Sequence, residues 1–99
     1  MIKEHYSSAI PTLFNAIAIT FGNHVFYEMS EDKITERLRR HEEIHVKQYK
    51  HLGVPLFLIL YLFEYFRNRL NGFTQEEAYR SISYEVEAVK AEGVTDGTD

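Results

Sequence analysis

The residues His41-Glu42-Glu43-Ile44-His45 match the pattern H-E-x-x-H, with two histidines four positions apart. On a helix, side chains four residues apart project from one face, so both imidazoles can reach a single ion. Zinc suits such ligands, and a catalytic zinc site keeps one position open for water. Glu42 is then predicted to act as the general base that takes a proton from the metal-activated water. The alternative is a pair of ordinary surface histidines.

A catalytic zinc normally has three protein ligands, and one candidate for the third is His51. It lies ten residues after His41, the spacing of H-E-x-x-H-x-x-G-x-x-H, but Gln48 replaces the glycine of that pattern. Glycine allows the chain to turn back toward the metal at that point. If the helix instead continues to Leu52, His51 points about 240° away from His45 and cannot coordinate.

A carboxylate on a later helix is the stronger candidate. Around residues 84–88 the sequence resembles the gluzincin-type metallopeptidases, whose third ligand is a glutamate in an E-x-x-A setting on a downstream helix. Glu85 and Ala88 match this setting, so the resemblance implies Glu85 as the ligand. Glu87 is the alternative, because residues two apart on a helix point about 200° apart and only one can face the metal. Val89 replaces the aspartate often found next, so a carboxylate that would orient a ligand histidine is missing or comes from elsewhere.

The resemblance extends over residues 38–92, through HEEIHVKQYKHLG, YLFEYF and AYRSISYEVEA. It is to small, largely uncharacterised bacterial proteins of zincin-like type with an H-E-x-x-H-x-x-Q core and a Y-R-x-x-x-x-E-x-E-A ending. It implies a zinc-dependent peptidase that hydrolyses peptide bonds of peptide or protein substrates. The competing hypothesis is a metal-stabilised structural or interaction module without activity. Four protein ligands, with His51 or Glu87 as the candidate fourth, would favour it.

Other side chains are candidates for supporting roles. Gln48 lies one turn after His45 and could hydrogen-bond near the metal. Glu64 interrupts an apolar run, where an isolated charge is costly to bury, so it pairs with a cation, reaches solvent or serves the site. An oxyanion is usually stabilised by a Tyr, His or Arg that faces the zinc. The candidates are Tyr79, Tyr84 and His24.

Two strands are expected before the motif. Residues 15–21 and 24–28 read as strands separated by Gly22 and Asn23, a pair that suits a tight reversal. The sequence therefore predicts a short antiparallel β-hairpin. Either strand could offer its edge to an extended peptide.

Three helices are expected after the hairpin, which makes the fold class α+β. Helical periodicity begins at Glu31, after Ser30 as a candidate N-cap, and ends at Gly53. The second helix is predicted to start near Pro55 and end near Leu70. The third starts at Thr74, which forms a capping box with Glu77, and runs toward Glu92, with Ser81 and Ser83 as places where it could break.

The length of 99 residues allows one hydrophobic core. We expect a single metal-binding domain over residues 1–92 and a disordered acidic tail over residues 93–99. The formal net charge of −4 argues against a general nucleic-acid binder. The chain has no cysteine, which excludes disulfides and thiolate ligands. No secretory signal is visible, so the default expectation is a cytoplasmic location.

The segment Val54 to Phe63 contains ten consecutive apolar residues, whereas a membrane-spanning helix needs about 20. We expect it to form a buried core helix. The alternative is contact with a membrane surface through Val54–Phe66, because a helix that is apolar nearly all round must be covered by something.

Overall fold

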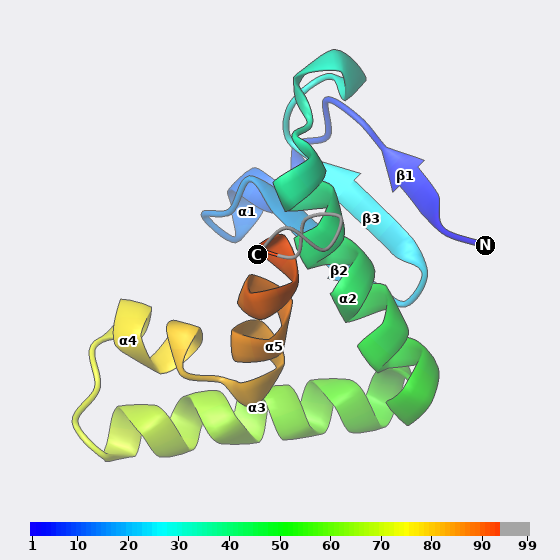
Figure 1. Cartoon of the computed structure of the whole chain (residues 1–99). Helices are drawn as coiled ribbons and strands as arrows, with labels where there is room; N and C mark the ends of the chain where they lie inside the picture. The colour runs from blue at the N-terminus through cyan, green and yellow to red at the C-terminus, as the bar shows by residue number, and fades with distance from the viewer. Residues whose placement is uncertain (94–99) are drawn as a thin grey trace.

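A computed structural model of the chain describes residues 1–93 and shows an α+β fold, as expected (Figure 1). Residues 94–99, most of the predicted disordered tail, lie outside the described residues. The first half holds β1 (Lys3–His5), α1 (Ile10–Leu13), β2 (Ala18–Phe21), β3 (His24–Tyr27) and the 3-10 helix η1 (Glu31–Lys33). The second half holds α2 (Glu36–Leu52), α3 (Val54–Leu70), α4 (Gln75–Arg80) and α5 (Ser83–Glu92).

The predicted hairpin is formed by β2 and β3, which pair antiparallel with Phe21 opposite His24. Gly22 occupies the tight turn with φ +63°, a conformation that glycine adopts without strain. The sequence did not predict β1, which pairs parallel with the other side of β3. Both edges of β3 are therefore occupied, which rules it out as a docking edge for a peptide. Within residues 1–93, the outer edge of β2 pairs with no strand.

The sheet is joined to the helices through alternating residues of β3. Val25 and Tyr27 are almost fully buried, and together with Val46 of α2 they form the central hydrophobic cluster. The alternation of buried and half-buried positions along β3 is that of a strand with one face on the core. This packing fixes α2 against the sheet.

Helix α2 starts five residues later than predicted. Its N-cap is Thr35, whose side chain accepts a hydrogen bond from the backbone N–H of Leu38. Ser30 instead precedes η1, and its hydroxyl donates to Asp32. The predicted end of the helix is confirmed, since α2 ends at Leu52 and Gly53 takes φ +81°. The H-E-x-x-H segment therefore lies in the middle of a regular helix.

The predicted third helix is divided into α4 and α5. The capping box between Thr74 and Glu77 is present, but α4 ends before Ser81 and α5 begins at Ser83. Glu64 of α3 stabilises the new helix start, because its carboxylate accepts hydrogen bonds from the backbone N–H and the hydroxyl of Ser83, both at 2.7 Å. The break allows α5 to turn and pack along α2 (Figure 1).

Helix α3 has the predicted length but is not a buried core helix. Only Phe57 and Asn68 are buried along it, while Ile59, Phe63 and Phe66 are 64%, 60% and 58% exposed. One side of α3 contacts α2 and α4, and no element of residues 1–93 covers the other side. The expectation of burial was wrong because the domain is too small to surround this helix. No helix among residues 1–93 is long and apolar enough to cross a membrane.

Candidate metal centre

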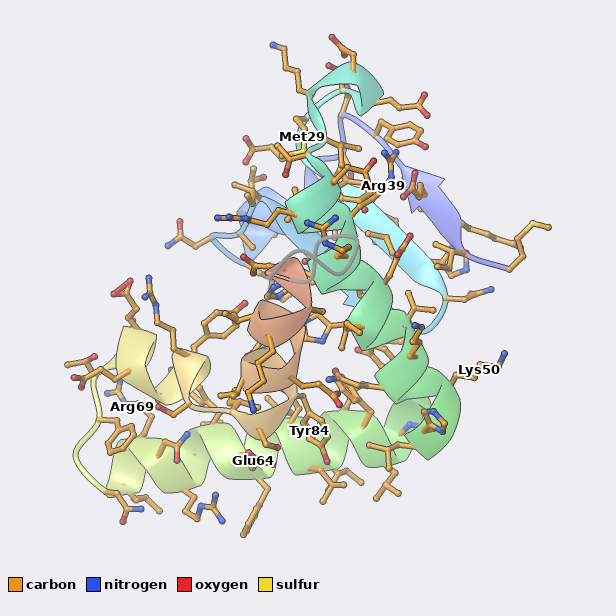
Figure 2. All side chains as sticks on the ribbon, in the orientation of Figure 1. Met29, Arg39, Lys50, Glu64, Arg69 and Tyr84 are labelled. Atoms are coloured by element: carbon orange, nitrogen blue, oxygen red, sulfur yellow. The ribbon has the colours of Figure 1, made fainter. Side chains whose placement is uncertain are left out.

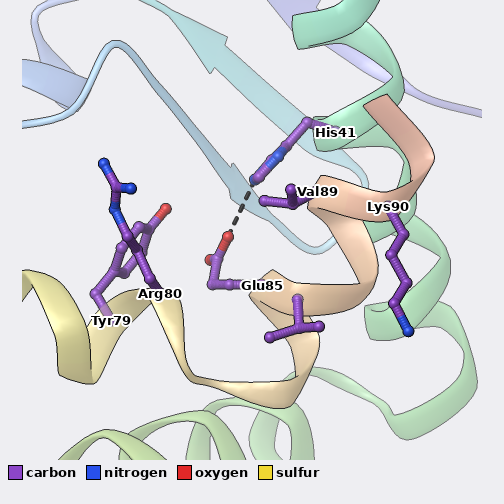
Figure 3. Close-up of a pocket in the computed structure, with 7 residues that line it drawn as sticks. His41, Tyr79, Arg80, Glu85, Val89 and Lys90 are labelled. Atoms are coloured by element: carbon purple, nitrogen blue, oxygen red, sulfur yellow. Dashed lines mark hydrogen bonds and ion pairs between the residues drawn. The ribbon is translucent and has the colours of Figure 1, made fainter. Parts of the chain in front are cut away.

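The close packing of α5 on α2 brings the histidines and the downstream glutamate together. Ala88 is fully buried at this contact, where a larger side chain would separate the helices. One turn earlier on α5, Glu85 faces the two histidines of α2, and Figure 3 shows its carboxylate directed at His41. The helix crossing thus assembles the site from two separate segments.

The donor atoms of these three residues converge on a small volume. The Nε2 atoms of His41 and His45 lie 3.0 Å and 3.1 Å from the same oxygen of Glu85, Oε1. One possible ligand atom from each residue lies within 4.8 Å of the others. His45 and Glu85 are buried and His41 is half-buried. The structure therefore brings together the three predicted metal ligands.

Glu92 holds the other ring nitrogen of His41. Its Oε2 atom lies 2.6 Å from His41 Nδ1. An ionised carboxylate only accepts hydrogen bonds, so His41 donates from Nδ1 and, when neutral, leaves the lone pair of Nε2 directed at the site. Glu92 supplies the orienting carboxylate that the sequence lacks at Val89.

Gln48 holds and orients the imidazole of His45, as Glu92 does for His41. Its Oε1 atom lies 2.8 Å from His45 Nδ1. The amide nitrogen of Gln48 donates to the backbone oxygen of Tyr84 at 3.0 Å and to Glu87 at 2.6 Å, which orients the amide oxygen toward the imidazole. Gln48 therefore fulfils the hydrogen-bonding role predicted for it near the site.

The electrostatics of the metal-free site reflect this crowding of acceptors. Burial lowers the pKa of His41, but hydrogen bonds to Glu85 and Glu92 outweigh it and raise the pKa to about 9. The pKa of His45 is also raised, since its contact with Glu85 outweighs burial. Burial alone would raise the pKa of Glu85, yet the two histidines hold it well below its usual range. Without a metal, the site therefore favours protonated histidines beside an ionised Glu85.

Glu42 lies on α2 with its carboxylate buried beside the sheet. Its Oε1 atom accepts a hydrogen bond of 2.8 Å from the hydroxyl of Thr20 on β2. Burial raises the pKa of Glu42, while the charge of His45 and the Thr20 hydrogen bond oppose the rise. A buried carboxylate with a raised pKa is suited to moving a proton near neutral pH.

Two tyrosines surround Glu85. The hydroxyl of Tyr61 on α3 donates to Glu85 Oε2 at 2.5 Å and so fixes the second oxygen of that carboxylate. Tyr79 lines a cavity of about 430 Å³ together with His41 and Glu85, and Figure 3 shows it on the opposite side of the cavity from Val89. Burial and the nearby charge of Glu85 raise the pKa of Tyr79, which keeps its hydroxyl protonated and able to donate.

The remaining candidates lie outside the cluster. His51 is exposed in the last turn of α2, and Glu87 is bound to Gln48. His24 belongs to the sheet, where its Nδ1 lies 3.1 Å from His5 Nε2. Tyr84 packs its ring on Phe57, 5.2 Å between centroids, and contributes its backbone oxygen to Gln48. Of the three oxyanion candidates, Tyr79 is the one that lines the cavity.

Replacing Glu92 by Ala is expected to weaken zinc binding about 10- to 100-fold, because His41 loses the acceptor that orients its ring. Competition with a chromophoric chelator measures the affinity. Glu76→Ala is the matched control, since Glu76 is an exposed carboxylate of α4 that pairs with Arg80 and lies outside the metal-ligand cluster. Equal affinity of the Glu92→Ala variant and the wild-type protein would contradict the role of Glu92.

Comparison of the chain with protein-family models, with curated proteins and with solved structures finds no match.

Proposed function

We propose that this protein is a zinc-dependent peptidase in which His41, His45 and Glu85 hold the ion and Glu42 is the general base. The observation that carries the proposal is the convergence of His41 Nε2 and His45 Nε2 on one oxygen of Glu85. Both Nδ1 atoms are engaged by Glu92 and Gln48, which directs the coordinating nitrogens inward.

The donor set fits a divalent ion. With the histidines neutral and protonated on Nδ1, three acceptors face one another without a hydrogen between them, an arrangement that is unfavourable unless a cation lies at their centre. Two imidazoles and one carboxylate, with an open fourth position, are the ligand set of many catalytic zinc sites. The set is also compatible with other divalent ions, among which zinc is our proposal.

The protein groups around the ion have separate tasks in peptide hydrolysis. Zinc, when bound, supplies a Lewis acid that polarises a carbonyl oxygen and makes water a better nucleophile. Glu42 takes a proton from the attacking water and delivers it to the leaving amine. Tyr79 donates a hydrogen bond to the carbonyl oxygen from the cavity wall. Thr20 keeps the Glu42 carboxylate in place from β2, whose outer edge aligns an extended substrate.

The first experiment measures zinc per chain by elemental analysis in the wild-type protein and in two single variants. Glu85→Ala is expected to lose most of the metal, because it removes one of three ligands. Glu76→Ala is the control, because Glu76 is an exposed carboxylate of α4 that pairs with Arg80, and it is expected to retain about one zinc per chain. Zinc loss in both variants, or in neither, would contradict Glu85 as the ligand. A wild-type protein without zinc would contradict the proposed function.

The structure gives less support to a purely structural metal site. A closed site needs four protein ligands, and the cluster found within residues 1–93 has three. His51 and Glu87, the predicted sources of a fourth, lie outside it. Three ligands leave a fourth coordination position for water, and His41 and Glu85 line a cavity. Glu42 is a buried carboxylate on α2, the helix that carries both histidines. Both features favour catalysis.

A further inference from the structure

The outer face of α3 is an exposed apolar surface on the side of the helix that faces away from α2 and α4. Six large apolar side chains lie on it and are between 46% and 88% exposed. These are Leu56, Ile59, Leu62, Phe63, Phe66 and Leu70. Figure 2 shows side chains projecting from α3 along the lower edge of the molecule, where no other element lies. We call these six residues the outer face of α3.

The charges around the outer face are of one sign. At about 100° per residue, Arg67 and Arg69 project on its two borders, about 160° apart, with the apolar side chains between them. The guanidinium of Arg67 lies over the ring of Phe63, with Cζ 5.8 Å from the ring centroid, so this cation directly borders the apolar side chains. The only acidic residue of α3, Glu64, points the other way and binds Ser83.

We propose that the outer face of α3 binds a membrane surface that contains anionic lipids. An amphipathic helix bordered by arginines lies in the plane of a lipid interface with its apolar side chains among the acyl chains and its cations at the headgroups. In a protein with a net charge of −4, a helix face whose only charged groups are two arginines selects an anionic partner.

A second copy of this chain fits the outer face less well. A symmetric pair would place two identical faces together, each with Arg67 and Arg69 and without a carboxylate to pair with them. Anionic headgroups supply that missing charge. The 3-4-3-4 spacing of Leu56, Ile59, Phe63, Phe66 and Leu70 would also suit a coiled coil, so the test must separate the two partners.

Binding through the outer face leaves the metal site accessible, because the site contacts the opposite face of α3. Tyr61 and Glu64 project from that inner face to Glu85 and Ser83 of α5. The membrane proposal therefore does not depend on the proposed peptidase activity, and either can fail alone.

Flotation of the full chain with two kinds of vesicle tests the proposal. One kind is phosphatidylcholine, and the other adds about 30% phosphatidylserine. We expect the wild-type protein to bind the anionic vesicles. Phe63→Glu is expected to bind them at least about tenfold more weakly, because it places a charge in the apolar layer. Leu13→Glu is the control, because Leu13 is an exposed apolar residue of α1, 77% exposed, away from α3. It is expected to bind as the wild-type protein does.

The arginines and the oligomeric state complete the test. Arg67→Gln and Arg69→Gln are each expected to weaken binding to anionic vesicles about fivefold and to leave binding to neutral vesicles unchanged. A wild-type protein that stays in solution with both vesicles would overturn the proposal. So would a dimer, seen by sedimentation equilibrium without vesicles, that Phe63→Glu converts to monomer, because the outer face would then be an interface between two copies.

Discussion

Replacing Glu42 by Gln is expected to lower peptide hydrolysis by about 10²- to 10⁴-fold while zinc stays bound. The amide has the shape of the carboxylate and can still accept the hydrogen bond of Thr20, so the local structure is retained. It cannot take a proton from water at neutral pH, and the proton transfer to the leaving amine is lost with it. Glu42 is not among the three converging ligands, which is why the metal should remain.

The measurement combines cleavage of a quenched fluorescent peptide library with elemental analysis of the same samples. Glu43→Gln is the matched control, because it removes a carboxylate next in sequence that lies outside the metal-ligand cluster. It is expected to keep the wild-type rate. Hydrolysis at the wild-type rate in Glu42→Gln would rule out Glu42 as the general base. A zinc-loaded wild-type protein that cleaves no peptide in the library would favour the interaction-module hypothesis instead.

The parts of the site that the sequence predicted lie within single helices. His41, His45 and Gln48 share one face of α2 because their spacing follows the helical repeat. Glu85 was predicted from the resemblance to the gluzincin-type metallopeptidases. Spacing within α2 alone does not indicate which later segment packs against that helix. Glu92 lies seven residues after Glu85, two turns along the same face, so a signal for it existed once Glu85 was chosen.

Tyr61 and Thr20 could not be found in this way. Tyr61 reaches Glu85 from 24 positions away in the sequence, and Thr20 reaches Glu42 from 22 positions away. Thr20 lies outside every quoted motif, and the YLFEYF segment that begins with Tyr61 assigned no role to that residue. Each contact exists only because α3 lies beside α5 and β2 packs beside α2. Such residues require the tertiary structure.

The fold was predictable where local signals decide it. Gly22-Asn23 marks the hairpin, and the Thr74 capping box marks a helix start. Strand β1 has three residues, Lys3–His5, and no apolar alternation, and its parallel partner β3 is remote in sequence. The break between α4 and α5 depends on Glu64, and the exposure of α3 depends on what surrounds it. Both are properties of the assembled domain.

Zinc affinity is expected to rise about tenfold per pH unit, for each proton released, between about pH 6 and pH 9. The histidines must be deprotonated at Nε2 to coordinate. In the metal-free site, hydrogen bonds to Glu85 and Glu92 outweigh burial and raise the pKa of His41 to about 9, so a proton competes with the ion below that pH. A chelator competition titration at several pH values measures the slope. An affinity independent of pH would contradict coordination by the histidines.

The stability of the metal-free protein is expected to change in the opposite direction. A histidine whose pKa is raised in the folded state contributes stability below its unfolded pKa of about 6.5, and this contribution is lost as the pH rises through about 9. With a chelator present, His41 should therefore make the melting temperature fall from pH 6 toward pH 9. Zinc at about 100 times its dissociation constant adds about 2.7 kcal/mol, or about 10–20 °C in a domain of this size.

The difference between the melting temperature with zinc and the melting temperature with chelator is consequently expected to widen with pH at a fixed zinc concentration. Zinc gains affinity as the pH rises, and over the same range the metal-free protein loses the stabilising contact between protonated His41 and Glu85. Thermal melts followed by circular dichroism, with zinc or with chelator, measure both curves. In Glu85→Ala the two curves should nearly coincide at every pH, since the variant lacks both the third ligand and the carboxylate that holds the protons. Coincident curves in the wild-type protein at pH 9 would show that zinc does not bind this fold.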